Sequence, residues 1–120
     1  MIERLTGFAD DIVAIAYRGS VTRNDYETVL IPAVEAALAR HDKVRFYCEV
    51  ADDFMGFEFG AMWDDWKLGL AHIMRWGAVA VVSDVGWIRA ATQAFSPFIP
   101  SGVKVFPLKE RAQAKAWLGG

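Results

Sequence analysis

Apolar residues form two nearly continuous runs in the middle of the chain, KVRFYCEV at residues 43–50 and WGAVAVVS at 76–83. Strands of a parallel sheet are covered on both faces, so they lose the alternation of apolar and polar residues. A helical pattern of apolar positions fills residues 58–75 between the two runs. Residues 43–84 therefore predict a parallel β-α-β unit.

Two further strands are predicted ahead of this unit. Residues 2–8 alternate between apolar and polar types, as an edge strand does, whereas residues 12–19 are apolar almost throughout, as a central strand is. Because only residues 9–11 separate them, we expect an antiparallel pair.

The first helix is expected to begin after Thr22 and to end near Arg40. Thr22 and Asp25 have the spacing of a weak capping box, and apolar residues recur at helical intervals from there. Pro32 lies inside this pattern and is expected to kink the helix or to loosen one turn, because it has no N–H to donate. Two shorter helices broken at Ile31 are the alternative.

The last part of the chain predicts three elements: a helix at 87–95, a short strand at 103–106 and a helix at 109–118. In the final helix we expect Ala112, Ala116 and Trp117 to face inward, and Gly119 to cap the end. The predicted order is β-β-α-β-α-β-α-β-α. It indicates a single α/β domain, residues 1–120, whose sheet is mostly parallel with an antiparallel N-terminal edge strand.

The composition excludes several classes of protein. Basic residues are scattered over a chain of net charge −2, so no basic stripe would follow a nucleic-acid backbone. No apolar run reaches the roughly 18 residues that a membrane-spanning helix needs. The N-terminus has no apolar segment typical of a signal peptide, and Cys48 is the single cysteine. We therefore expect a cytoplasmic protein that binds no nucleic acid.

Three aspartates are the strongest candidates for catalytic or metal chemistry. Asp52, Asp53 and Asp84 follow two strands predicted to be parallel, so their carboxylates would meet at one edge, where a cation such as Mg²⁺ prefers oxygen ligands. Turn formation and helix capping explain the same residues. No phosphate-binding glycine loop or nucleophile motif accompanies them. We predict a protein that is not an enzyme, with no catalytic residue, no metal and no cofactor.

Large apolar side chains crowd into residues 54–66. They are Phe54, Met55, Phe57, Phe59, Met62, Trp63 and Trp66. Because a helix buries one stripe, not all of them can face the sheet. The others would line a pocket, meet a partner or contact a membrane. A core rich in large side chains is the alternative interpretation.

With these residues in view, the chain resembles the SpoIIAA-like family, which is related to the STAS domains of sulfate transporters and anti-sigma-factor antagonists. The resemblance covers essentially the whole chain and is carried by the segments GSVTRNDYETVLIPAVEAAL, DFMGFEFGAMWDDWKLG and VAVVSDVGW. It implies a curved sheet wound with helices as a βα superhelix, similar also to the CRAL-TRIO lipid-binding fold. It further implies a non-enzymatic protein that binds a hydrophobic ligand or a membrane surface by moving its second and third helices.

The chain departs from this pattern at one turn. True anti-sigma-factor antagonists carry a phosphorylatable serine at the turn that enters the second helix. Here residues 52–57 read DDFMGF, without serine or threonine. The phosphorylation switch therefore cannot operate at that position.

We predict a binding module that holds a small apolar or amphipathic, lipid-like ligand between the second and third helices, with peripheral contact to the inner membrane surface. Aromatic residues would form the walls, and Asp64 and Lys67 would orient a polar end unless they form only a surface ion pair. The predicted ligand-binding residues are Phe54, Phe57, Phe59, Trp63, Asp64, Trp66, Lys67, Asp84 and Trp87. The alternative is a STAS-type regulatory or protein–protein interaction module, a homodimer that uses the same aromatic side chains.

Overall fold

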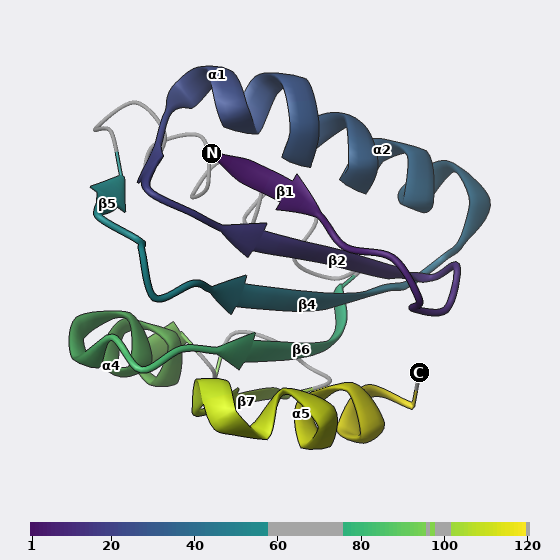
Figure 1. The fold of residues 1–120 in the computed structure, drawn as a ribbon. Helices are drawn as coiled ribbons and strands as arrows, with labels where there is room; N and C mark the ends of the chain where they lie inside the picture. The colour runs from purple at the N-terminus through teal and green to yellow at the C-terminus, as the bar shows by residue number, and fades with distance from the viewer. Residues whose placement is uncertain (58–75, 96, 98–101, 120) are drawn as a thin grey trace.

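A five-stranded sheet forms the centre of the computed structural model, which describes residues 1–57, 76–95, 97 and 102–119 (Figure 1). Its strands, in spatial order, are β1 (Ile2–Arg4), β2 (Ile12–Tyr17), β4 (Val44–Val50), β6 (Trp76–Val82) and β7 (Val103–Phe106). β1 pairs with β2 in antiparallel fashion, and every other neighbouring pair is parallel. The predicted α/β architecture with an antiparallel N-terminal edge strand is confirmed.

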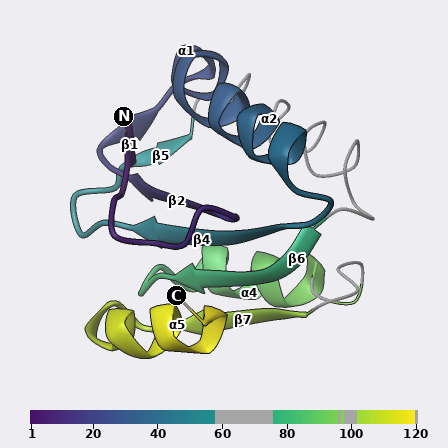
Figure 2. The same ribbon diagram turned by 90° about the vertical axis from the view of Figure 1, so that its right-hand side faces the viewer.

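Helices cover both faces of this sheet (Figures 1 and 2). On one face lie α1 (Arg23–Asp25), the π-helical segment η1 (Tyr26–Leu30), α2 (Ile31–Arg40) and α4 (Gly86–Phe95). On the other face lie the 3₁₀ turn η4 (Leu108–Glu110) and α5 (Arg111–Leu118). Since side chains alternate along a strand, β2 sends Val13 and Ile15 to the first core and Ile12 and Ala14 to the second.

The first helical segment begins as predicted. Thr22 Oγ1 accepts from the Asp25 backbone N–H at 3.2 Å, and Asp25 Oδ2 accepts from the Thr22 backbone N–H at 2.8 Å. These two bonds complete the capping box. Pro32 follows a wide π turn, in which the Ile31 N–H donates to the Tyr26 carbonyl. Because Ile31 keeps helical angles (φ −59°, ψ −47°), the chain loosens one turn before Pro32 and does not break into two helices.

Near the N-terminus the strands are shorter than predicted. β1 ends at Arg4, and a loop with Gly7 at φ +84° fills the rest of the predicted 2–8 strand. After β2, Gly19 at φ +53° turns the chain into β3 (Ser20–Val21). β3 pairs in parallel with β5 (Gly56–Phe57), forming a small second sheet that the sequence pattern did not predict.

The inward face of α5 differs from the prediction. Ala114 and Leu118 are buried, whereas Ala112 and Ala116 are exposed and Trp117 is 38% exposed. Ala112 and Ala116 each precede a buried residue by two positions, which places them about 200° away around the helix. Trp117 lies at the rim, with its ring centre 6.1 Å from that of Phe106. Gly119 ends the helix at φ +87°, as predicted.

The predicted helix at residues 58–75 lies outside the described residues. Within the parts of the chain that are described, no helix combines the length and the apolar character needed to cross a bilayer.

Removing the capping hydroxyl is expected to weaken the fold. Thr22→Ala should lower the free energy of unfolding by about 1 kcal/mol, because the Asp25 N–H loses its acceptor. The midpoint of urea denaturation measures this change.

Thr28→Ala is the matched control. Thr28 is exposed, and its hydroxyl donates to the Asn24 carbonyl within the helical segment, so its loss should change stability by less than about 0.5 kcal/mol. Equal effects of the two substitutions would contradict a capping role for Thr22.

Candidate functional site

The carboxyl ends of β2, β4 and β6 lie at one edge of the sheet (Figure 1). Three connections leave from this edge: residues 18–21 after β2, residues 51–57 after β4 and residues 83–87 after β6. We call these three segments together the carboxyl edge. Open parallel sheets bind ligands at this kind of edge, because all their strand ends and following loops converge there.

Backbone hydrogen bonds hold the turn that follows β4. The Ala51 N–H donates to the Tyr17 carbonyl at 2.9 Å, and the Met55 N–H donates to the Gly19 carbonyl at 2.8 Å. Phe54 is partly buried and packs against the core beneath α2. Met55, the next residue, is 82% exposed. The turn is therefore anchored on both sides, while it presents one large apolar side chain to solvent.

Aspartates on this edge shape the backbone. Asp84 Oδ1 accepts from the Leu108 N–H at 3.1 Å, so this carboxylate supports the start of η4. Asp52 and Asp53 are exposed. Among the described residues, no three histidine, cysteine, aspartate or glutamate side chains come together as a possible metal site. Turn formation and capping therefore account for Asp84 without a cation.

The segment after β6 leads directly into α4. Ser83 is fully buried, and its Oγ accepts from the Val85 N–H at 3.0 Å. Arg89 Nη1 donates to the Ser83 carbonyl at 2.8 Å, which fixes the first turns of the helix. Ile88 enters the core, whereas Trp87 is 53% exposed. This connection presents a second large apolar side chain at the carboxyl edge.

A buried carboxylate lies on the opposite face of the sheet, under α5. Glu49, near the end of β4, is only 8% exposed. Its Oε1 accepts from the Tyr47 hydroxyl at 2.8 Å and lies 3.0 Å from Arg111 Nε. Burial and, after it, the bond to Glu49 raise the pKa of Tyr47 above its usual value near 10. The sequence analysis missed this network, although a lone glutamate in an apolar strand was the signal that pointed to it.

The described members of the predicted ligand site lie at the carboxyl edge. Phe54 and Phe57 follow β4, with Phe57 in β5, and Asp84 and Trp87 follow β6. Met55, which the prediction left out of the ligand-binding set, is the most exposed of the large apolar residues in the described part of the chain. The remaining predicted members lie outside the described residues: Phe59, Trp63, Asp64, Trp66 and Lys67.

Comparison with known proteins gives one family and one fold. The family model described as SpoIIAA-like matches residues 12–119. A crystal structure of an uncharacterized protein of the DUF3478 family from Shewanella loihica PV-4, described as having a SpoIIAA-like fold, is 28% identical in sequence with a TM-score of 0.76. The alignment covers 98% of this chain and 93% of the other. The search of curated proteins found no match.

Tyr47→Phe tests the buried network. The substitution removes one donor from the buried Glu49 carboxylate, so it should lower the free energy of unfolding by about 1–3 kcal/mol near neutral pH. Because folding raises the pKa of Tyr47, its hydroxyl stabilises the fold fully below the unfolded value near 10, and this contribution is lost as pH rises further. The stability difference between wild type and variant should therefore shrink above about pH 10. Urea unfolding of wild type and variant at about pH 8 and about pH 11 measures this stability difference at each pH. An equal difference at the two pH values would contradict the raised pKa of Tyr47.

Proposed function

The chain belongs to the SpoIIAA-like family, and we propose that within it this protein is a non-enzymatic binding module for a small apolar or amphipathic ligand. SpoIIAA-like proteins are generally non-enzymatic, and their STAS-type fold is that of a regulatory or interaction module. The proposal adds a ligand class and a place, the carboxyl edge.

One observation carries the proposal: two large apolar side chains are exposed at the same edge, Met55 at 82% and Trp87 at 53%. Single exposed apolar residues are ordinary on protein surfaces. Here each one follows a different strand of the same parallel pair, β4 and β6, where α/β sheets commonly bind ligands. Covering a side chain of this size removes enough apolar surface from water to contribute about 1.5–3 kcal/mol.

The charges beside these side chains favour a particular polar group on the ligand. Asp52 and Asp53 are exposed in the same turn as Met55, so an anionic group would be repelled there. A neutral or cationic head is favoured, and the exposed ring of Trp87 suits a quaternary ammonium in particular. Within the proposal, the aromatic residues Phe59, Trp63 and Trp66 would extend the apolar wall, and Asp64 and Lys67 would contact the polar end.

The exposed side chains of Met55 and Trp87 would also suit an alternative function, the binding of a macromolecule or a membrane. A second copy of the chain, a partner protein or the inner membrane surface would also cover Met55 and Trp87. Light scattering over a range of concentrations separates self-association from ligand binding, since a dimer that hides these side chains leaves them unavailable to a lipid.

Native mass spectrometry of the purified protein, before and after organic extraction, is the first experiment. A mass excess that extraction removes supports a carried lipid-like ligand. An unliganded mass that occurs only as a dimer would instead favour the interaction module.

Trp87→Ser should weaken binding of lysophosphatidylcholine, added below its critical micelle concentration, by at least about tenfold, which corresponds to about 1.4 kcal/mol. The physical reason is the loss of the largest exposed apolar side chain at the carboxyl edge. Isothermal titration calorimetry measures the Kd, and Met55→Ser should act in the same direction.

Trp117→Ser is the matched control. Trp117 is also partly exposed, but it belongs to α5, which packs on the opposite face of the sheet from α4, and its ring lies 6.1 Å from that of Phe106. Its loss should leave the Kd unchanged. Equal weakening by both tryptophan substitutions would argue against a site at the carboxyl edge.

A further inference from the structure

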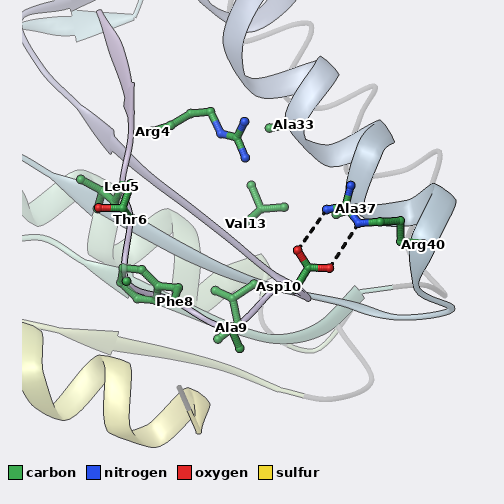
Figure 3. Close-up of a pocket in the computed structure, with 12 residues that line it drawn as sticks. Arg4, Leu5, Thr6, Phe8, Ala9, Asp10, Val13, Ala33, Ala37 and Arg40 are labelled. Atoms are coloured by element: carbon green, nitrogen blue, oxygen red, sulfur yellow. Dashed lines mark hydrogen bonds and ion pairs between the residues drawn. The ribbon is translucent and has the colours of Figure 1, made fainter.

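A pocket of about 140 Å³ lies at the opposite end of the sheet, between helix α2 and the loop at residues 5–11 that joins β1 to β2 (Figure 3). Small residues leave this space open, since Ala33 and Ala37 face it from the helix and Gly7 and Ala9 from the loop. A cavity of about 150 Å³ accommodates a six-carbon ring. The pocket is thus large enough for an organic ligand of a few non-hydrogen atoms.

Two guanidinium groups and one carboxylate border the pocket. Arg40 donates to both oxygens of Asp10, at 3.2 Å from Nε and 3.4 Å from Nη2, and His41 Nε2 lies 2.9 Å from the same carboxylate. The His41 bond and the Arg40 pairing lower the pKa of Asp10, which keeps this group ionised at neutral pH. Asp10 and Arg40 are therefore already engaged with each other.

Arg4 differs from Arg40. Its guanidinium points into the pocket from the end of β1 (Figure 3), and no side chain or carbonyl among the described residues pairs with it. A guanidinium presents its N–H groups as a planar fork that matches the two oxygens of a carboxylate. The free donors in this pocket thus suit an oxyanion.

The charge balance selects the kind of oxyanion. Of the charged side chains that line the pocket, Arg4 and Arg40 against Asp10 leave one positive charge unbalanced, which a monoanion neutralises and a dianion exceeds. The nearby Lys115 ammonium does not line the pocket, and it is engaged over the Phe8 ring, 4.9 Å from the ring centre. The last turns of α2 also border the pocket, and the negative end of the helix dipole opposes any anion there, a dianion about twice as strongly as a monoanion. We propose that this pocket binds a small carboxylate monoanion, with Arg4 as its main ligand.

The walls limit the length of the carbon chain. Val13, Ala33 and Ala37 are all at most 5% exposed, so they offer little apolar surface for a long tail. Phe8 is half-buried, and its ring packs against Tyr47 with centres 4.8 Å apart. A short-chain carboxylate therefore fits better than a fatty acid, and this site is independent of the ligand proposed for the carboxyl edge.

Titration of the ¹⁵N-labelled protein with sodium acetate, at constant ionic strength, tests the site. Amide resonances of the 5–11 loop and of α2 should shift in a saturable manner, and sodium sulfate should bind at least about tenfold more weakly. Arg4→Gln should weaken acetate binding at least tenfold. Because Arg4 is exposed and pairs with no described residue, the amide spectrum of the Arg4→Gln variant without acetate should match that of the folded wild-type protein.

Two further variants sharpen the test. Asp10→Asn removes the one carboxylate among the described residues that line the pocket, so it should strengthen acetate binding several-fold and reduce the ratio of the sulfate Kd to the acetate Kd. Arg23→Gln makes the same charge change as Arg4→Gln at the start of the helical segment, away from the pocket, and should leave binding unchanged. Absence of saturable shifts, equal acetate binding in Arg4→Gln and wild type, or weaker binding in Asp10→Asn would overturn the proposal.

Discussion

The parallel strands must be covered on both faces, and the rest of the structure depends on this constraint. All six residues of β2 are buried, and their alternate side chains enter two separate cores. Neighbouring parallel strands also need long connections, which pass over the faces as helices. One layer of helices, α2 with α4, and a second, α5, are therefore required by the sheet itself. The two edges where the connections gather follow from the same requirement.

Glu49 shows what the covering of both faces requires of a charged residue in a central strand. A carboxylate in a covered strand loses its hydration, so it needs partners that replace water. Arg111 and Tyr47 provide them, and Arg111 is the first residue of α5. Removing one partner of a buried charge destabilises the fold by more than the net stabilisation that the pair provides, because the remaining charge stays buried without a partner. The network thus ties the start of α5 to the carboxyl end of β4.

The sequence predicted the features that depend on long patterns or on local chemistry. Buried parallel strands carry continuous apolar runs, and the Thr22 capping box needs only neighbouring residues, so both were predictable. β3 and β5 have two residues each and pair across a long stretch of chain, which leaves no periodicity to read. In α5 the prediction preferred Trp117 to Leu118, although the smaller residue fills the core. Hydrophobicity likewise placed Phe54 and Met55 in one cluster and could not show that the backbone turns one inward and the other outward.

The two ends of the sheet have acquired different chemistry. One end exposes large apolar side chains, Met55 and Trp87, beside the acidic Asp52 and Asp53. The other end has the two guanidinium groups of Arg4 and Arg40 around Asp10. Seven residues of β4 separate these ends, a distance of about 23 Å at about 3.3 Å per residue. Ligands at the two ends therefore cannot touch each other. Any influence of one on the other must pass through elements that reach both ends, and the continuous helical segment from Arg23 to Arg40 is one of them. The π turn of this segment, where the Ile31 N–H donates to the Tyr26 carbonyl, interrupts the regular α-helical hydrogen-bond pattern between its two halves.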